Sequence, residues 1–407
     1  MRRSAGDTGG RVPGLRAPGG ERRIDRWQRA VGALSSEAPR ISVVGLGLIG
    51  GSIGLAAHER LDGARVRGWT RSRESLDRAL ELGAVDEACE SVEEAVTTSD
   101  ICFVCTSVGA LSRYVRDALE AGGDCVVTDV GSVKQALNSE LHSSGLPQAD
   151  LQRFIGGHPL AGAEASGVEH ARADLFAGAT WYLTPSETSS GVLYERLYRT
   201  IAKLGAHPTA IDAATHDRMM ATVSHLPHVL ANVLVSQAAR ALADESQTLP
   251  ATGPSFRDAA RVAGANPPLW HEIFMGNRQA LIAEIENYTD ALRDVRKALD
   301  ETDGESLDGW IEQARADRHR LLESELAGGP VSELHVSVPN KPGIVAQVSL
   351  ALGEAGVNIV DMALYPAADM QSGAITLWVS GASAASRAVK LIGELGYPAS
   401  VVADGEG

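Results

Sequence analysis

The residues that could do chemistry include a histidine inside a glycine-rich run. Residues 154–167 read FIGGHPLAGAEASG, and His158 stands between Gly157 and Pro159 after a short apolar stretch. Glycine allows a strand to end abruptly, and proline stiffens the chain that leaves it. An imidazole held in this way can accept a proton near neutral pH. We therefore predict a tight turn that carries His158 as a general base, against the commoner alternative of a structural loop histidine.

Two other stretches carry polar residues that could meet this histidine. VTDVGSVK (127–134) ends an apolar strand and continues with small and polar residues that suit the wall of a crevice, Ser132 among them. HDRMMATVSHLPHVL (216–230) reads as a helix, on which Ser224 and His228 share one face. We expect both stretches to line the site.

The same helical stretch contains a proline and a second histidine. Pro227 is expected to kink the helix and to free a backbone carbonyl. His225 and His228 are three residues apart and could hold a metal, but the run has neither cysteine nor a second ligand motif nearby. We therefore predict no metal site.

Two arginines follow in FRDAARVAGANPPLW (256–270). Arg257 and Arg261 lie one turn apart if this segment is helical. A guanidinium near a loop can clamp a carboxylate with two hydrogen bonds, although an exposed arginine is the usual alternative. Together, a histidine, a hydroxyl and an arginine suit the oxidation of an alcohol carbon on a substrate that bears carboxylates, if the chain also binds a cofactor that accepts a hydride.

A dinucleotide site is indicated near the start of the chain. Residues 45–50 read GLGLIG, which matches G-x-G-x-x-G, follows the apolar strand ISVV and opens a helix. The second strand ends in Thr70 and Arg71, where an acidic residue would bind the ribose of NAD. A missing carboxylate beside an arginine favours the 2′-phosphate of NADP, with NAD as the alternative. The expected cofactor contacts are Gly45, Gly47, Leu48, Ile49, Gly50, Thr70, Arg71, Ser107 and Asp129.

The pattern of strands and helices predicts three folded domains. From residue 40, apolar strands alternate with helical stretches as far as FIGGHP, which predicts an α/β domain with a parallel, doubly wound (Rossmann-like) sheet over residues 40–188. Residues 189–326 show no convincing strand and predict an all-helical substrate and dimerisation domain, with an irregular break at 250–268. Residues 332–404 predict a ferredoxin-like β-α-β-β-α-β unit. Residues 1–39 are rich in Arg, Gly and Pro and are expected to be a disordered extension.

Composition narrows the function classes. The formal net charge of −15 argues against a nucleic-acid or anionic-membrane partner. No run of about 18 apolar residues stands out, so we expect no membrane span. Cys102 and Cys105 form C-x-x-C inside an apolar strand, which places their side chains on opposite faces. Buried thiols in a reducing cytoplasm are the interpretation we adopt.

With these residues in view, the chain resembles the prephenate/arogenate dehydrogenases. The motifs that carry the resemblance are GLGLIGGS, TDVGSVK, GGHPxAGxExSG, SHLPH and FRDxxRxAxxxPxLW, all in order between residues 41 and 326. Residues 333–403 resemble an ACT domain through PNKPGIVAQV and GVNIVDM. The chain departs from the family at Ala163, where a threonine is frequent, and at Thr70, where an aspartate is usual.

The resemblance implies oxidative decarboxylation in tyrosine synthesis. Prephenate would give 4-hydroxyphenylpyruvate, or arogenate would give tyrosine directly. His158 would take the proton of the ring C4 hydroxyl while hydride leaves for the nicotinamide, and Ser132 would share that hydroxyl and orient His158. Arg261 would bind a substrate carboxylate, His228 and Ser224 would line the side-chain pocket, and Glu164 would gate the entrance.

The resemblance also implies partners. A homodimer would form through the helical domain, with Trp270 near the neighbouring subunit. Tyrosine would bind the ACT domain as a feedback inhibitor, near Asn358 and Asp361; a dimerisation module without ligand is the alternative.

Two rival functions are weaker. A 3-hydroxyacid-type reductase would need a catalytic helix-borne lysine, but Lys203 and Lys297 stand in no motif. A non-catalytic regulator that senses NADP and an amino acid would not need His158, Ser132 and Arg261 together.

Overall fold

The computed structural model describes residues 38–162, 165–243, 253–324, 331–339, 341, 344–357, 359–366 and 372–402. The chain divides into two compact units, Met1–Leu249 with Ala259–Glu286, and Pro250–Asp258 with Asn287–Gly407. The expected extension before residue 38, the gating residue Glu164, and Ala163 and Asn358 lie outside the described residues.

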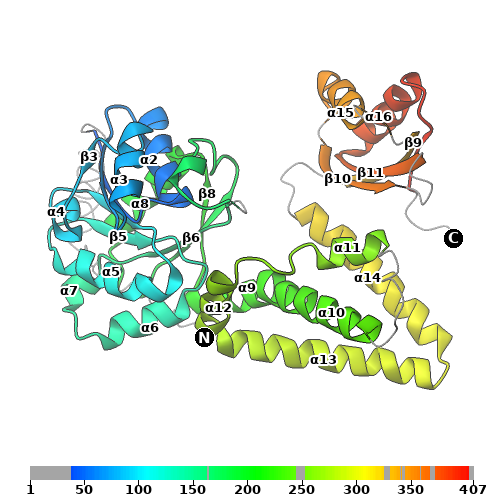
Figure 1. The fold of residues 1–407 in the computed structure, drawn as a ribbon, viewed down its shortest axis with the longest axis horizontal. Helices are drawn as coiled ribbons and strands as arrows, with labels where there is room; N and C mark the ends of the chain where they lie inside the picture. Colours follow the sequence, from blue (N-terminus) through cyan, green and yellow to red (C-terminus); the bar gives the residue numbers. More distant parts are fainter. Residues whose placement is uncertain are drawn as a thin grey trace, which may run out of the picture. The chain divides into compact units, whose positions relative to one another are not determined.

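A five-stranded parallel sheet forms the centre of the first unit, in the order β3-β2-β1-β4-β5. The strands are β1 (Arg40–Val44), β2 (Arg65–Trp69), β3 (Glu87–Ala88), β4 (Ile101–Val104) and β5 (Val126–Asp129). Helices follow the strands as α2 (Leu48–Arg60), α3 (Arg73–Glu81), α4 (Val92–Val96), α5 (Val108–Glu120), α6 (Gln135–Ser143) and α7 (Gln148–Leu151). Neighbouring strand residues enter separate cores, Val43 with Phe103 in one and Val44 with Val104 in the other. Both faces of the sheet are therefore covered, which confirms the predicted doubly wound arrangement (Figure 1).

The glycine-rich stretch after β5 joins the parallel sheet only at its start, and its strand belongs to a second sheet, so the expected continuation of the parallel series is confirmed only in part. β6 (Gly156–Pro159) pairs antiparallel with β7 (Thr180–Thr184), which pairs parallel with β8 (His207–Ala210). A single bridge between Val127 and Phe154 links the two sheets. Helix α8 (Gly191–Lys203) and the 3₁₀ turn Val168–His170 complete this part.

The expected absence of strands after residue 191 is wrong, because β8 lies there. β8 is a mostly exposed strand of four residues that contains Pro208, and it therefore lacks the apolar alternation by which a strand is recognised in sequence.

The rest of the predicted helical region is helical. Its elements are α9 (Ala213–Met220), a π turn (Ala221–His225), α10 (Leu226–Ala243), α11 (Pro254–Ala260), α12 (Pro267–Gly276), α13 (Arg278–Asp300) and α14 (Gly304–Ser324). The expected irregular break thus contains a short helix, α11. The π turn ends just before Pro227, which has no N–H to bond the carbonyl of Val223, so the predicted disturbance is confirmed as a wider turn.

One helical run is long and apolar enough to cross a membrane by length and composition. It spans Ala213–Ala241, and an 18-residue window within it has a mean hydropathy of 1.2. The same run contains His216, Asp217 and His225, which are buried and hydrogen-bonded to other parts of the first unit. These bonds fit a packed helix of a folded domain better than a membrane span.

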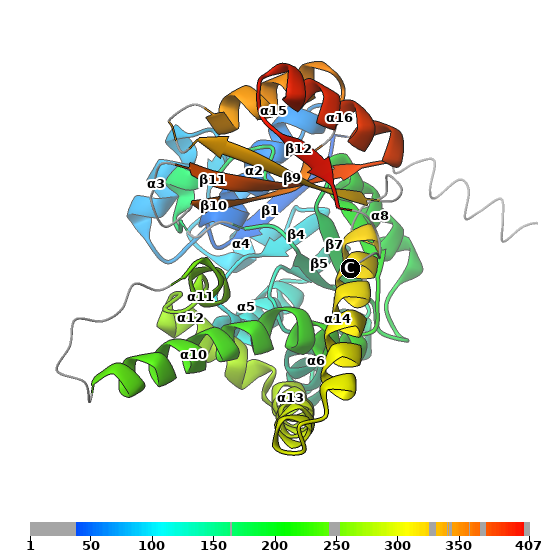
Figure 2. The same ribbon diagram turned by 90° about the vertical axis from the view of Figure 1, so that its right-hand side faces the viewer.

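The C-terminal part of the second unit has the predicted β-α-β-β-α-β order. Its elements are β9 (Val331–Pro339), α15 (Ile344–Glu354), β10 (Ile359–Pro366), β11 (Ser372–Ser380), α16 (Ala382–Glu394) and β12 (Ala399–Val401). The strands form an antiparallel sheet in the order β10-β11-β9-β12. Both helices cover the same face of this sheet (Figure 2), and Leu334, Val348, Leu377 and Ala388 are among the residues of the core between them.

Candidate active site

A pocket opens where β1, β2 and β4 of the parallel sheet end. It is lined by Gly45, Leu46, Gly47, Trp69, Thr70, Arg71, Cys105, Thr106, Ser107, Ala110 and Tyr114. Five of the expected cofactor contacts are thus brought together, namely Gly45, Gly47, Thr70, Arg71 and Ser107. The N-terminus of α2 begins at the same place, with Gly47 as its first flanking residue. Its free N–H groups and the helix dipole suit a pyrophosphate.

Two glycines of the G-x-G-x-x-G motif are required by close packing. Gly45 has a φ of +100°, and a Cβ there would lie 2.5 Å from the carbonyl oxygen of Cys105. A Cβ on Gly50 would lie 2.1 Å from the carbonyl oxygen of Gly45, because α2 packs directly on the loop. Gly50 therefore positions the helix, while Leu48 and Ile49 lie on α2 outside the pocket lining.

The end of β2 presents a cation and no carboxylate to the pocket. Arg71 is exposed and lines the pocket beside Thr70, and no acidic residue is among the lining residues of the described chain. The neighbouring Arg73 is instead bonded to Asp77 and Glu90. The surroundings of Arg71 are compatible with a 2′-phosphate, and the preference for NADP stays a prediction.

His158 lies on β6 and is held by a second histidine. Its Nδ1 is 2.9 Å from Nε2 of His216 on α9, and Nδ1 of His216 is 2.8 Å from Oδ1 of Asp217. His216 and Asp217 are 0 % and 1 % exposed. The side chain of His158 is therefore fixed by a chain of hydrogen bonds that comes from the helical part of the first unit.

The surroundings of His158 keep it neutral. Burial lowers the pKa of His158 well below its usual value, and the neighbouring His216, Lys134 and His225 lower this pKa further. A neutral imidazole has a free lone pair and can accept a proton, as a general base must.

Asp129 belongs to the interior and not to the cofactor pocket, so its prediction as a cofactor contact is wrong. It is 0 % exposed, and its carboxylate binds the ammonium of Lys134 and accepts hydrogen bonds from the N–H groups of Gly131 and Gly157. Lys134 also donates to the carbonyl oxygen of Gly157. Burial lowers the pKa of Lys134, against the opposing effect of Asp129. This ion pair fixes the residue that precedes His158.

Ser132 is half-buried on the loop between β5 and α6. Among the described residues, the His158 ring forms its hydrogen bond with His216 and not with Ser132. The expected role of Ser132 on the substrate hydroxyl stays a prediction.

A third group of predicted residues meets around α10 and α12. His228 stacks on Trp270, with ring centroids 3.4 Å apart. Burial lowers the pKa of His228, and the nearby guanidinium of Arg261 lowers this pKa further, so these two predicted side chains do lie together. Nδ1 of His228 is buried and has no hydrogen-bond partner among the described residues. Ser224 is half-buried in the π turn.

Four residues that matter to this geometry had no predicted role: His216, Asp217, Asn277 and Glu272. Asn277 donates to the carbonyl oxygen of Asp217 and contacts Nδ1 of His225. Glu272 accepts a hydrogen bond from Gly109 at the N-terminus of α5, next to the pocket residue Ser107. The only local signal for the first two was the adjacent His and Asp at the start of the 216–230 stretch.

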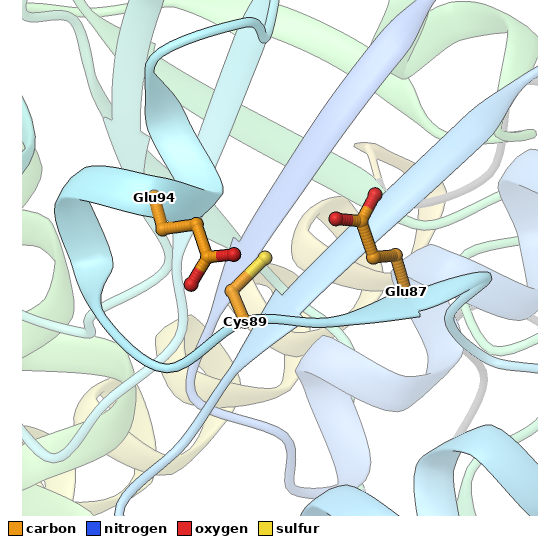
Figure 3. A group of neighbouring side chains, drawn as sticks. All are labelled: Glu87, Cys89 and Glu94. Carbon is orange, nitrogen blue, oxygen red and sulfur yellow. The ribbon is translucent and has the colours of Figure 1, made fainter.

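A second cluster of possible ligands lies away from these residues. Glu87, Cys89 and Glu94 approach one another at the edge of the parallel sheet (Figure 3). Arg67 already donates two hydrogen bonds to the carboxylate of Glu87, and burial raises the pKa of Cys89 to about 11. A protonated thiol and a neutralised carboxylate make this a poor metal site.

The four cysteines, Cys89, Cys102, Cys105 and Cys125, are free. Cys102 lies in β4, and burial raises its pKa to about 12. The interpretation of the C-x-x-C pair as buried thiols is confirmed for Cys102. Cys105 is also a free thiol, but it is only half-buried.

Comparison with known families matches the two parts of this site separately. Residues 53–209 match the nucleotide-binding domain of prephenate dehydrogenase, and residues 212–313 match its dimerization domain. The chain is 29 % identical over 327 residues to a prephenate dehydrogenase of Bacillus subtilis, covering 79 % of this chain and 87 % of the relative. It is 30 % identical over 272 residues to a cyclohexadienyl dehydrogenase of Zymomonas mobilis, covering 66 % of this chain and 90 % of the relative.

Solved structures give the same result. Prephenate dehydrogenase from A. aeolicus, in complex with hydroxyphenyl propionate and NAD⁺, aligns with a TM-score of 0.64 and 27 % identity over 70 % of this chain and 99 % of its own. Arogenate dehydrogenase from Synechocystis aligns with a TM-score of 0.61 and 29 % identity over 69 % and 99 %. These matches show that the chain belongs to the prephenate dehydrogenase family of oxidoreductases.

Proposed function

We propose that this chain catalyses the NAD(P)-dependent oxidative decarboxylation of prephenate to 4-hydroxyphenylpyruvate. The observation that carries the proposal is His158, a neutral imidazole held by His216 on the strand that follows the dinucleotide-binding sheet. The choice of prephenate as substrate is supported by the relatives named above. The pocket at the ends of β1, β2 and β4 supports the position of the cofactor.

His158 acts on the hydroxyl at C4 of the substrate ring. The O–H bond breaks, its proton moves to the imidazole, and the oxygen electron pair forms the carbonyl as the C4 hydrogen leaves as hydride. The cofactor supplies the acceptor for that hydride. Loss of CO₂ then returns its bonding electron pair to the ring, and His158 gives the proton back to the resulting phenolate. The reaction therefore consumes no net proton at His158.

We assign recognition of the substrate carboxylates and side chain to Arg261, His228 and Ser224, with Glu164 at the entrance. Arg261 and His228 lie together, and the unpartnered Nδ1 of His228 can bond a polar substrate atom. An Arg–carboxylate bond is charge-assisted and geometrically specific. Replacing Arg261 by Met is expected to raise KM for the substrate at least about tenfold with little change in KM for the cofactor.

The cofactor is proposed to be NADP in preference to NAD, because Arg71 lines the pocket where a carboxylate would otherwise bind the ribose. Arogenate remains the alternative substrate, supported by the Synechocystis relative.

One experiment tests these assignments together. Initial rates are measured with prephenate and arogenate, each with NAD⁺ and with NADP⁺, for the wild type and for His158→Asn. We expect turnover of prephenate by the wild type, and a loss of about 10²–10⁴-fold in kcat for His158→Asn with cofactor binding retained. Turnover that survives in His158→Asn would refute the proposed base. Turnover of arogenate but not of prephenate would show that arogenate is the substrate.

A homodimer is proposed to form through the helical segments. Large apolar side chains are exposed there, for example Val233 at 55 %, Leu292 at 53 % and Trp310 at 54 %. Exposed apolar side chains on these helices support an interface there. Light scattering should give twice the chain mass, and Val233→Asp should shift the equilibrium toward the monomer. An unchanged mass for the variant would remove α10 from the interface.

The C-terminal part of the second unit, from β9 to β12, is proposed to be an ACT domain that binds tyrosine as a feedback inhibitor. Its β-α-β-β-α-β order and its strand order support this assignment. It also contacts α14: Arg318 lies over the ring of Trp378 at 4.7 Å and pairs with Glu333. The two matched family domains span residues 53–209 and 212–313, so a chain ending at Leu326 retains both. Tyrosine should inhibit the full chain and not the shortened one; equal inhibition would refute the assignment.

We also propose a cytoplasmic location. The four free cysteines are consistent with a reducing compartment.

A further inference from the structure

The hydrogen bonds around Asp217 fix which of its partners donate. Oδ1 of Asp217 accepts from the backbone N–H of Lys134 at 2.9 Å, and Oδ2 accepts from the backbone N–H of Gln135 at 2.8 Å. An ionised carboxylate can only accept, so the Nδ1 of His216 that lies 2.8 Å from Oδ1 must carry a proton. Asp217 thereby selects one tautomer of His216.

The tautomer of His216 then determines that of His158. A neutral imidazole with a proton on Nδ1 has a lone pair on Nε2, so the 2.9 Å contact between His216 Nε2 and His158 Nδ1 requires the proton on His158 Nδ1. Nε2 of a neutral His158 is consequently unprotonated. With Asp217 ionised and both histidines neutral, this is the arrangement in which every donor of the three side chains meets an acceptor.

We propose that His216 and Asp217 are positioning residues that hold His158 in the Nδ1-protonated tautomer, so that Nε2 is the atom which takes the substrate proton. This inference rests on the proposed role of His158 as the base. When Nε2 accepts the proton from the C4 hydroxyl, the imidazolium keeps its Nδ1–H bond to His216. The buried carboxylate of Asp217 lies at the other end of the same chain and stabilises the positive charge. The proton returns from Nε2 to the phenolate, and the chain is restored.

Other groups around the two rings do not provide this function. His225 contacts Asn277, and Lys134 is bonded to Asp129 and the carbonyl of Gly157. Tyr182 on β7 faces His216 with ring centroids 5.7 Å apart, and its hydroxyl contacts the sulfur of Met219. Asp217 is the acceptor that bonds His216, and His216 is the acceptor that bonds His158.

The first test replaces Asp217 by Asn. An amide carries no charge to stabilise the imidazolium, and its NH₂ group must face one of the two backbone N–H donors. With the NH₂ group on the side of His216, it donates to Nδ1, which moves the His216 proton to Nε2 and the His158 proton to Nε2, where it blocks the base. We expect kcat to fall about 100-fold or more, with KM for substrate and cofactor within about threefold. The kcat of His216→Leu should fall similarly. The amide oxygen of Gln can accept a hydrogen bond from His158 Nδ1, so the kcat of His216→Gln should be at least about tenfold higher than that of His216→Leu. Tyr182→Phe is the matched control, because it disturbs packing on His216 without changing the hydrogen-bond chain, and should keep kcat within about threefold.

A spectroscopic test does not depend on turnover. In the ¹⁵N-histidine-labelled wild type, the resonances of His158, assigned by their loss in His158→Asn, should show a protonated Nδ1 and an unprotonated Nε2. Asp217→Asn should reverse them. The opposite tautomer in the wild type would overturn the inference, as would a kcat of His216→Leu equal to that of Tyr182→Phe. Those results are distinct from failure of the proposed function, in which His158→Asn itself would retain activity.

Discussion

The ammonium group of Lys134 and the carboxylate of Asp129 form an ion pair inside the first unit, where the two side chains are 1 % and 0 % exposed. The pair holds both backbone groups of one residue, because Lys134 donates to the carbonyl of Gly157 and Asp129 accepts from its N–H. Gly157 immediately precedes His158. A buried charge pair therefore fixes the start of the strand that carries the proposed base.

Breaking this pair should be costly. Lys134→Met leaves the carboxylate of Asp129 buried without its counter-charge, and we expect the free energy of unfolding to fall by about 3–5 kcal/mol. Urea denaturation measures the change. Adding Asp129→Asn should restore part of the loss by removing the orphaned charge, and Lys203→Met on the exposed surface of α8 should change stability by less than about 0.5 kcal/mol. Absence of any recovery in the double variant would contradict the ion-pair account.

Buried neutral histidines should make stability fall in acid. Burial lowers the pKa of His225 to about 4 and lowers the pKa of His158 well below its usual value, whereas both titrate near 6.5 in the unfolded chain. Between about pH 6.5 and pH 4 the unfolded state therefore binds more protons, so the free energy of unfolding decreases as pH falls through this window, by at most about 1.4 kcal/mol per pH unit for each histidine. Above pH 6.5 the contribution is constant.

Denaturation curves between pH 7.5 and pH 4.5 measure this slope. His225→Gln should reduce the slope by about one bound proton, while His207→Gln at an exposed position should leave it unchanged. An identical slope in wild type and His225→Gln would show that His225 is not the source.

The first glycine of the dinucleotide motif should not tolerate a side chain. Gly45→Ala would combine a φ of +100° with a Cβ 2.5 Å from the carbonyl of Cys105. We expect destabilisation of about 1–3 kcal/mol or more and loss of cofactor binding by calorimetry. Gly83→Ala is the matched control: its φ is +69°, but nothing lies within 4 Å of the added Cβ. Equal effects of the two variants would show that the close contact between a Cβ at position 45 and the carbonyl of Cys105 is not the cause.

Arg71 should decide between the two cofactors. Replacing it by Ala removes the exposed cation from the pocket lining, so KM for NADP⁺ should rise about tenfold or more while KM for NAD⁺ stays within about twofold. Arg73→Ala is the control, because that guanidinium is bonded to Asp77 and Glu90. A parallel rise for both cofactors in Arg71→Ala would show a contact with the shared part of the dinucleotide.

The parts predicted correctly from the sequence are those whose cause is local. Gly45 and Gly50 stand in a strand, turn and helix that are continuous in the chain, so their spacing was sufficient to place the cofactor pocket. The tight turn around His158 was predicted because glycine and proline surround it directly, and its role as a base stays a prediction.

The parts that were missed depend on partners far away in the chain. His216 lies 58 residues after His158, and no local pattern states that the two rings meet. Asp129 reads as a polar residue at a strand end, where a ligand contact is reasonable, but Lys134 turns it into an interior ion pair. β8 was missed because its burial is too slight to impose an apolar alternation.

The π turn before Pro227 accommodates one extra residue in an otherwise regular helix. In a continuous α-helix, the 12 residues from His216 to His228 would turn these side chains about 120° apart. With one residue taken up by the wider turn, the separation falls to about 20°, so both rings share one side of the α9–α10 run. Deleting a single residue within 221–223 should therefore restore ordinary helical geometry and still leave His216 and His228 aligned. The turn is where this helix can change length without moving its two histidines out of line.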